Sequence, residues 1–417
     1  MLPFASTGEG SASFTDSLFT ATSAVCVTGL VVQDTATYWT AFGQAVILVM
    51  IQIGGLGVIT MALLLSLITG KKIGLNQRST MKESISAPNV GGIVRMTGFI
   101  IKVTVIIEIT GAIIMMPVFC SELGVKGVWY AFFHSISCFC NAGFDLMGYK
   151  ENFSSVTSFY DNPVINIVLM VLIVVGGLGF LVWSDIKTHG IHIKRYRLQS
   201  KLVFAVTAVL IVIPALYYFF FEFTPERWRE FTLKDRIFVS LFQTITPRTA
   251  GFNTVDLSKM SGASQALMIV LMLIGGSSGS TAGGLKVTTV AVLFCSFVSV
   301  LKRRENTEAF GRRIPNERIR YAGVLLVMYI TLFFVSGMII SQVDSLPISV
   351  ALFETASAVG TVGLTLGVTP SLSLISRTIL ILLMFIGRVG GITVIYATLS
   401  SRKNQIAQLP QENVTVG

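Results

Sequence analysis

Long hydrophobic stretches, separated by short polar segments, run along most of this chain. Val164 to Val182 and Tyr321 to Ile340 each approach the roughly 20 apolar residues that a helix needs to cross a lipid bilayer. The mean hydropathy is +0.75, and 12% of the residues are charged, about half the share that is usual in soluble domains. The pattern therefore predicts an all-α integral membrane protein with several spans.

Between the long stretches lie four shorter segments that resemble one another. Each begins with Phe, continues with Ser or Thr at alternate positions, and reaches a Gly flanked by a small residue and by Leu or Phe. They read "FTATSAVCVTGLVVQD" from Phe19, "FHSISCFCNAGFDLMG" from Phe133, "FQTITPRTAGFNTVD" from Phe242 and "FETASAVGTVGLTLG" from Phe353. Their glycines, Gly29, Gly143, Gly251 and Gly363, follow at near-equal intervals, although the third copy is one residue shorter. This regularity indicates an internal fourfold repeat.

The surroundings of each copy also recur. An apolar helix with small residues near its middle is expected after each one, at "IGGLGVIT", "VGGLGFLV", "IGGSSGSTAGGLKVTT" and "IGRVGGITV". A longer apolar helix is expected before three of them, at roughly Gly91 to Val118, Gln199 to Phe221 and Arg318 to Ser341. Each unit is thus a helix (M1), a short re-entrant pore segment and a second helix (M2). The predicted repeats are 1–88, 89–198, 199–317 and 318–417, with M1 of the first largely missing from this numbering.

The net charge of +10 comes mainly from four clusters of basic residues. More than half of the 31 lysines and arginines lie within 71–82, 187–201, 302–320 and 402–403. Cytoplasmic loops of membrane proteins are rich in Lys and Arg. We therefore expect these segments and the C-terminal tail to be cytoplasmic and the pore segments to face outside. This distribution indicates topology and contact with membrane lipid, and no nucleic-acid partner. The surplus around Arg312 and Arg313 predicts contact with a soluble partner.

The pore segments are too short to span a bilayer, and inside it their backbone must be satisfied, line water or bind an ion. A half-helix such as Pro347 to Val359, followed by an extended run ending in glycine, presents carbonyl oxygens to a central axis. Rings of carbonyl oxygens replace the hydration shell of K⁺ in potassium filters. The filter candidates are Val27, Thr28, Gly29, Asn141, Ala142, Gly143, Thr249, Ala250, Gly251, Thr361, Val362 and Gly363, with K⁺ expected at the four glycines.

The third M2 is interrupted by a run of small residues. The run comprises Gly275, Gly276, Ser277, Ser278, Gly279, Ser280, Thr281, Ala282, Gly283 and Gly284. Each Gly costs about 1 kcal/mol relative to Ala in a helix interior, so five together should abolish the helix. Lipid cannot satisfy the freed backbone groups, so the run must be buried in protein or border the pore. We expect it to be a gating loop beneath the filter.

Three charged residues lie at membrane depth. Arg388, near the middle of the last helix, is expected either to pair with helix-end carbonyls or to line the path beneath the filter and hold the loop. Glu108, inside an M1 helix, is expected to be a buried structural partner rather than an ion ligand. Arg248, beside the third pore segment, is expected to brace that segment.

The sequence argues against catalysis in this chain. The glycine-rich run lacks the G-K-[ST] ending of a phosphate-binding loop, since Lys286 is followed by Val287. The three histidines are scattered, and the five cysteines form neither a paired framework nor a C-x-x-C motif. No organic cofactor is expected. The alternative to a filter is a secondary transporter that couples another cation or a small solute to an ion gradient, but such folds are typically built from twofold inverted repeats.

The stretches "TATSAVCVTGL", "FCNAGF", "TPRTAGFNTVD", "GTVGLTLG" and "GGSSGSTAGG" resemble the Trk/Ktr/HKT superfamily of potassium transporters. The resemblance covers essentially the whole chain and is nearest to the bacterial KtrB-type membrane subunits. It implies four M1–pore–M2 units around one ion pathway, K⁺ as the transported ion and gating by the loop in the third repeat. In related plant members a serine at the first filter position favours sodium, so glycine at all four positions favours potassium.

The same resemblance implies several properties beyond the pore. They are a homodimer in the bacterial plasma membrane, a cytosolic ring of nucleotide-binding subunits of the KtrA/TrkA type, and sodium as an activator of transport. One departure concerns the first repeat, because Met1 to Phe4 corresponds to Met115 to Phe119, the end of the second M1. Either this numbering starts after an omitted segment, which is the interpretation we prefer, or the fourfold scaffold is short by one outer helix.

Overall fold

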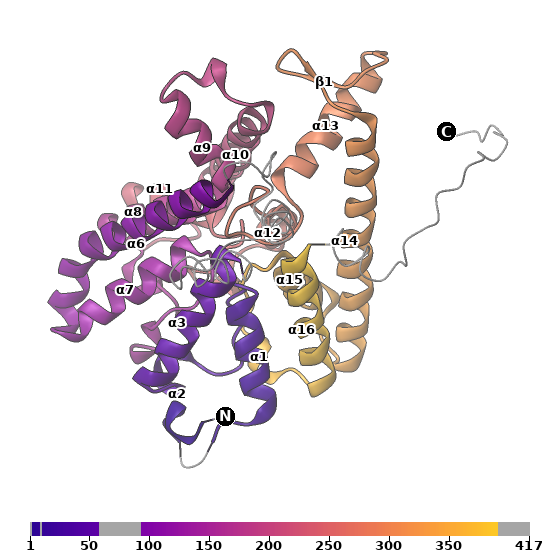
Figure 1. The fold of residues 1–417 in the computed structure, drawn as a ribbon. Coiled ribbons are helices and arrows are strands. Elements are labelled where there is room, and N and C mark those ends of the chain that lie inside the picture. Colours follow the sequence, from indigo (N-terminus) through magenta and orange to yellow (C-terminus); the bar gives the residue numbers. More distant parts are fainter. Residues whose placement is uncertain (1, 9–10, 58–92, 391–417) are drawn as a thin grey trace.

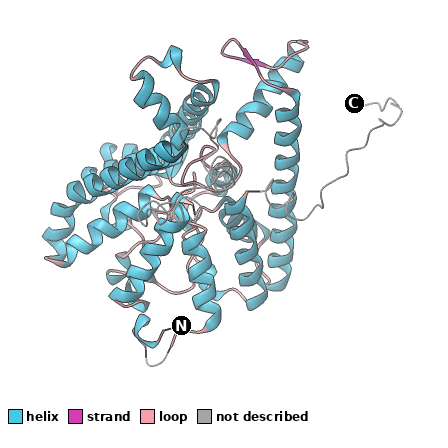
Figure 2. Cartoon of the chain, in the orientation of Figure 1, coloured by secondary structure: helices cyan, strands magenta, loops and turns pink. Residues whose placement is uncertain are grey.

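The computed structural model describes residues 2–8, 11–57 and 93–390 (Figure 1). Regular structure in these residues is almost entirely helical (Figure 2), and the described strands are β1 (Glu308–Ala309) and β2 (Arg312–Arg313), which form one antiparallel hairpin. The predicted all-α class is confirmed. The basic segments 71–82 and 402–403 lie outside the described residues.

Three long helices are apolar enough to cross a membrane by length and composition. They are α6 (Ile93–Leu123), α10 (Leu198–Tyr217), which continues into the π-helical turn η5 (Tyr218–Glu222), and α14 (Asn316–Val343). Large apolar side chains are exposed along all three, as at Ile113, Ile213 and Met338. Such surfaces suit lipid rather than water. The three predicted M1 helices are therefore present, with ends that differ from the predicted ones by a few residues.

A shorter helix follows each long one and packs against it: α7 (Lys126–Phe139) on α6, α11 (Leu233–Ile245) on α10 and α15 (Ile348–Gly360) on α14. A fourth short helix, α1 (Phe14–Val25), lies near the N-terminus. The N-terminus of α11 carries a capping box, in which Thr232 and Asp235 satisfy each other's backbone N–H groups. Ser13 caps α1 in a similar way through the Asp16 N–H.

The chain then turns through a glycine segment and enters a further apolar helix. These helices are α3 (Ala41–Leu56), α8 (Pro163–Leu178) with α9 (Phe180–His189), α12 (Gly262–Leu273) with α13 (Val287–Leu301), and α16 (Leu374–Val389). The short connecting elements are η1 (Pro3–Ala5), α2 (Thr35–Tyr38), η2 (Met147–Tyr149), η3 (Thr157–Phe159), η4 (Ile193–Arg195), η6 (Leu257–Lys259) and η7 (Thr369–Ser371). The order long helix, short helix, glycine segment and apolar helix thus occurs three times in the described residues; the exact boundaries of the repeats stay a prediction.

The helix after the second glycine segment is bent, which the sequence did not predict. The axes of α8 and α9 differ by 93°. Gly179 lies between them with φ +94°, a backbone angle that glycine adopts readily and other residues avoid. The Phe180 N–H, freed from the helix, donates to Gly279 O at 2.7 Å. The expected continuous M2 is therefore wrong for this repeat, because another chain segment satisfies the backbone at the break.

The basic loops that the structure describes lie at one end of the molecule. Helix α9 and the β1–β2 hairpin stand at the top of Figure 1, whereas α2 and the N-terminal residues stand at the bottom. The segments 187–201 and 302–320 are therefore on the same side, as the charge pattern predicts for cytoplasmic loops. The glycine segments lie between these two ends.

Candidate functional site

The four glycine segments leave their short helices through the same unusual backbone conformation. The residue two positions before each glycine has a positive φ: +57° at Val27, +58° at Asn141, +71° at Thr249 and +52° at Thr361. The glycines that follow also have positive φ, from +70° to +94°. A left-handed residue costs roughly 1–2 kcal/mol for an L-amino acid. The predicted run is thus not simply extended: it begins with a left-handed residue that turns the chain away from the helix axis.

Backbone N–H groups of these segments are held by the last turn of each short helix. In three of the copies a serine at the equivalent position is the acceptor. Its carbonyl oxygen accepts at 2.8 Å from the N–H of the residue before the glycine. The pairs are Thr28 with Ser23, Ala142 with Ser137 and Val362 with Ser357. In the third copy, which is one residue shorter, Ala250 donates instead to Thr246 O at 2.9 Å. The missing residue thus falls in the turn between Thr246 and Gly251, after α11 has ended at Ile245.

The glycines themselves close a ring, which we call the glycine ring: Gly29, Gly143, Gly251 and Gly363. A Cβ at Gly143 would lie 2.9 Å from the carbonyl oxygen of Ala250, the residue before Gly251. A Cβ at each of the other three glycines would lie still closer to the equivalent carbonyl oxygen of a neighbouring repeat. The cycle of neighbours runs through all four repeats and returns from Gly363 to Thr28 O and Gly29. The structure thus brings all twelve predicted filter residues together, and side chains at the four glycines would collide with the ring's carbonyls.

Two charged side chains lie beside this ring and bind neighbouring helices. Arg248 is 7% exposed, and its Nη2 donates to Thr207 Oγ1 on α10 at 3.2 Å. Glu108 on α6 is 6% exposed and accepts two hydrogen bonds, at 3.1 and 3.2 Å, from Gln52 Nε2 on α3. Among the described ion pairs, none involves Glu108. These contacts fit the structural roles expected for both residues.

The interrupted helix forms a loop, residues 274–286, against the helix-end side of the ring. The break falls where the sequence predicts it, since α12 ends at Leu273 and α13 begins at Val287. Residues 275–277 and 281–285 are buried, whereas 278–280 are half-exposed. The Thr281 hydroxyl donates to Phe139 O, at the end of α7, at 3.2 Å. A Cβ at Gly284 would lie 2.9 Å from Gly360 O, at the end of α15. The loop therefore touches the ends of two short helices.

Neighbouring helices hold this loop through its backbone. The Ser277 N–H donates to Gly177 O of α8 at 2.9 Å, and the Gly284 N–H donates to Gly387 O of α16 at 3.1 Å. The two ends of the loop also meet, because Gly275 N–H donates to Leu285 O at 2.8 Å. The freed backbone groups of the broken helix are thus paired with protein, which satisfies the requirement that lipid cannot meet.

Two cationic side chains bind carbonyl oxygens of the loop. Arg388 donates through Nη1 to Thr281 O and through Nη2 to Gly54 O and, at 3.1 Å, to Gly55 O of α3. Lys286 donates through Nζ to Ala282 O at 2.6 Å and to Gly283 O at 3.2 Å. The expected contact between Arg388 and the loop is present. Within the described residues α16 ends at Val389, and Gly390 has φ +87°. The expected position of Arg388 near the middle of the last helix depends on residues after Gly390, which lie outside the described residues.

The contact between Lys286 and the loop was not predicted from the sequence. A signal for it exists, because a cation at the N-terminal cap of α13 is unfavourable to the helix dipole and calls for another partner. Three consecutive loop carbonyls, 281 to 283, therefore point to cations from two different parts of the chain.

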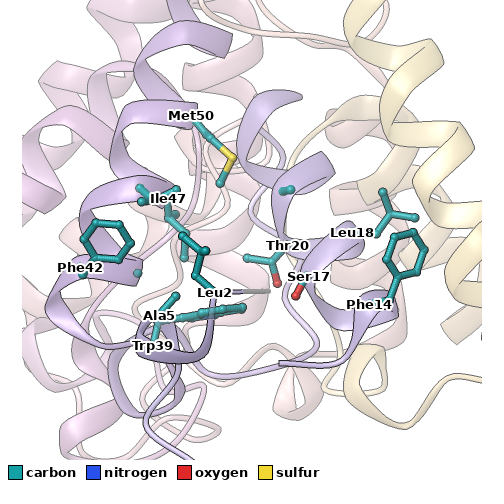
Figure 3. Close-up of a pocket in the computed structure, with 13 residues that line it drawn as sticks. Leu2, Ala5, Phe14, Ser17, Leu18, Thr20, Trp39, Phe42, Ile47 and Met50 are labelled. Atoms are coloured by element: carbon teal, nitrogen blue, oxygen red, sulfur yellow. The ribbon is translucent and has the colours of Figure 1, made fainter. Parts of the chain in front are cut away.

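The outer face of the first repeat carries an apolar groove of about 360 Å³ between α1 and α3 (Figure 3). Phe14 and Leu18 line it from α1, and Phe42, Ile47 and Met50 line it from α3. In the later repeats, the long helices α6, α10 and α14 lie against the corresponding short helices. The predicted M1 of the first repeat has no counterpart in the described residues, and its place stays a prediction.

Comparison with known proteins gives one consistent family. Residues 4–406 match the family model TrkH, described as a cation transport protein. The whole chain is 39% identical to the potassium/sodium uptake protein NtpJ of Enterococcus hirae and 36% identical to the Ktr system potassium uptake protein B of Bacillus subtilis, and it covers 92% of each. The fold resembles the crystal structure of the potassium transporter TrkH from Vibrio parahaemolyticus with a TM-score of 0.71, over 93% of this chain and 79% of that one, at 21% identity.

Proposed function

Because the chain belongs to the TrkH family of cation transport proteins, we propose that it is a multi-pass membrane protein that takes up potassium. Its curated relatives are named for potassium or potassium/sodium uptake. The proposed path runs through the glycine ring, which acts as the selectivity filter. Any energy or nucleotide sensing is assigned to a partner, since two relatives are named as proteins of a Ktr system.

The observation that carries this proposal is the closed cycle of four backbone segments. Each segment places a carbonyl oxygen next to the glycine of the neighbouring repeat, with no side chain between them. Carbonyl oxygens arranged around an axis can replace the water around a K⁺ ion. The short helices end at this ring, so the negative ends of their dipoles face it and favour a cation there. Glycine in all four positions supports potassium over sodium.

The loop of residues 274–286 is proposed as the gate. It lies against the ends of α7 and α15, on the cytoplasmic side of the ring in the predicted orientation. Arg388 and Lys286 hold its carbonyls, and the α8 and α16 ends hold its N–H groups. A loop that rests on a few hydrogen bonds rather than on a packed helix can exchange them for others at small cost. Moving it would open the path beneath the ring.

The partner and the assembly are proposed from the family and the charge pattern. The relatives named as Ktr system proteins imply a further component, which we propose to be a cytosolic ring of nucleotide-binding subunits beneath a homodimer. The β1–β2 hairpin is the proposed contact, since Arg312 and Arg313 are exposed there at the basic end of the molecule. Sodium is proposed as an activator of transport.

Ion uptake tests the proposal directly. A bacterium that lacks its own potassium uptake systems is transformed with this chain, with and without its partner, and K⁺, Rb⁺ and Na⁺ uptake are measured across a range of external concentrations. Growth at low external K⁺, together with faster K⁺ than Na⁺ uptake, is the expected result. A chain that reaches the membrane with its partner and moves no K⁺ would overturn the proposal.

A further inference from the structure

One position on the short helices differs in every repeat although its surroundings are alike. It is the residue directly after the shared Phe, namely Thr20, His134, Gln243 and Glu354. All four side chains are buried, with exposed fractions between 0% and 3%. A threonine, an imidazole, an amide and a carboxyl group have little in common except polarity, so packing alone does not select them.

In three repeats this side chain binds the backbone or side chain three residues beyond the ring glycine. The Leu146 N–H donates to His134 Nε2 at 3.4 Å, Gln243 Nε2 donates to Thr254 Oγ1 at 3.4 Å, and the Leu366 N–H donates to Glu354 Oε1 at 3.2 Å. We call this contact the outer brace. In the first repeat it is missing, because Thr20 borders the apolar groove and its hydroxyl has no hydrogen bond within the described residues.

The brace in the fourth repeat is much the strongest. Glu354 accepts from the Thr365 hydroxyl at 2.5 Å and from the Thr369 hydroxyl at 2.8 Å, in addition to the Leu366 N–H. Hydrogen bonds to a carboxylate are shorter and roughly twice as strong as neutral ones, and the two other braces are single contacts at 3.4 Å. The four segments are thus anchored unequally on their outer side.

The fourth segment is also fixed on its inner side, by a contact that the first segment shares, since the Gly29 N–H donates to Ser23 Oγ at 3.1 Å. The Gly363 N–H donates to Ser357 Oγ at 3.0 Å, and the Val362 N–H donates to Ser357 O at 2.8 Å. Ser357 and Glu354 lie one turn apart on α15. One helix therefore holds the segment both before and after its ring carbonyls, which leaves little freedom for the carbonyls between.

We infer that Glu354 is a positioning residue for cation selectivity, holding the fourth segment of the ring through Thr365, Leu366 and Thr369. The inference rests on the proposed filter and goes beyond it, since it assigns the ring's rigidity mainly to one repeat. A filter prefers the ion whose size matches the carbonyls it can hold in place. Loosening the fourth segment allows the carbonyls to close on the smaller Na⁺, whereas the unbraced first segment has no such contact to lose.

Three variants test this assignment. Glu354→Ala removes the brace, Glu354→Gln keeps one acceptor oxygen at similar length, and Thr20→Val is the matched control at the equivalent position. The ratio of K⁺ to Na⁺ uptake is measured in cells, with each rate divided by the amount of protein in the membrane. We expect the ratio to fall about tenfold in Glu354→Ala, since hydrogen bonds to a charged group are lost, to fall less in Glu354→Gln, and to stay unchanged in Thr20→Val.

If Glu354 only stabilises the fold, a different result is expected. The Glu354 variants would then be less abundant in the membrane, but the K⁺ to Na⁺ uptake ratio of the remaining protein would be unchanged, and that outcome overturns the inference. So does an equal loss of selectivity in Thr20→Val. If neither Glu354 variant reaches the membrane, Thr365→Val removes one donor and leaves the carboxyl group; an unchanged ratio there also overturns it. A wild-type chain that moves no K⁺ contradicts the proposed function instead.

Discussion

The two sides of the glycine ring differ in how far the repeats resemble one another. On the side of the short helices, four segments repeat the same backbone pattern: a left-handed residue two positions before a glycine, with nearly the same backbone hydrogen bonds. On the other side, α3, α8 and α16 each reach a glycine with φ between +87° and +94°, at Gly57, Gly179 and Gly390, whereas α12 gives way to a loop. The first side is nearly fourfold, and the second is not.

This contrast follows from what each side is proposed to do. Four alike carbonyl positions are needed to surround an ion evenly, so a change in any one repeat disturbs the whole ring. Blocking a path needs only one obstacle, so a single repeat can supply it while the others support it. The unequal outer braces show that even the symmetrical side is built from different side chains, provided that the backbone arrives at the same place.

The largest expected effect is a loss of selectivity on the symmetrical side. Gly29→Ser and Gly363→Ser each add a side chain that would meet the carbonyl oxygen of a neighbouring repeat, at a positive φ. A shift that costs K⁺ about 1.4 kcal/mol relative to Na⁺ lowers discrimination about tenfold, and we expect at least this change in competitive K⁺ and Na⁺ uptake.

Gly323→Ser is the matched control for these variants. Gly323 lies on α14, its φ is not positive, and a Cβ there would meet nothing within 4 Å. The same substitutions at Gly143 and Gly251 complete the set. If all four ring variants reach the membrane and discriminate as the wild type does, the glycine ring is not the filter.

The second effect concerns the asymmetric side. Deleting 276–283 removes the proposed gate, and the shortened chain can close because Gly275 lies next to the start of Gly284: a Cβ at Gly275 would collide with Gly283 O. The deletion removes several hydrogen bonds that hold the loop, each worth about 1 kcal/mol, so basal K⁺ flux is expected to rise about tenfold. Its dependence on the regulatory partner should fall. Flux is measured as initial K⁺ uptake with and without the partner; a deletion protein that conducts at the wild-type rate with intact regulation excludes the loop as gate.

The symmetrical side was also the easier one to predict from sequence. The long helices and the four glycines follow from hydrophobic length and from repetition. On the asymmetric side, the break after Leu273 was also predicted, from the poor helix propensity of glycine. These signals are local or recur along the chain. The left-handed residues at Val27, Asn141, Thr249 and Thr361 were missed, because valine and threonine rarely adopt that angle and only the surrounding hydrogen bonds enforce it.

The features that the sequence did not give depend on contacts between distant segments. The bend at Gly179 is stabilised by Gly279 O from another repeat, and "VGGLG" carries no sign of that partner. Arg388 was correctly linked to the loop, but the end of α16 beside it, within the described residues, depends on the conformation of Gly390. The residues of the outer brace can be located in the sequence, since each directly follows the Phe shared by the four segments. Their contacts cannot, because a polar residue at that position does not reveal where its side chain points.

A smaller effect is expected where the gate is held rather than formed. Arg388→Lys keeps the charge but loses the planar fork that reaches both the loop and α3. One lost hydrogen bond of about 1 kcal/mol predicts a rise in basal K⁺ flux of about fivefold. Arg377→Lys is the control, because Arg377 lies on the same helix and binds Asp16 and Pro370 O away from the loop. Equal flux changes in the two variants would mean that Arg388 acts through helix stability and not through the loop.

The smallest effect is expected at the cytoplasmic end of the asymmetric side. Arg312→Glu combined with Arg313→Glu reverses the charge of strand β2, whose side chains are exposed. An exposed ion pair contributes about 0.2–1 kcal/mol, so affinity for the regulatory partner should fall about threefold, and more at low salt.

Affinity is measured by titrating the purified membrane protein with its partner at two salt concentrations. Lys259→Glu, a charge reversal beside Asp256 in the connection between α11 and α12, is the control and should leave the affinity unchanged. A double variant that binds and responds to the partner as the wild type does, but binds anionic lipid vesicles less well, assigns the hairpin to the membrane surface. In that case the asymmetry of the third repeat ends at the loop, and the partner must reach the gate through another element of the cytoplasmic face.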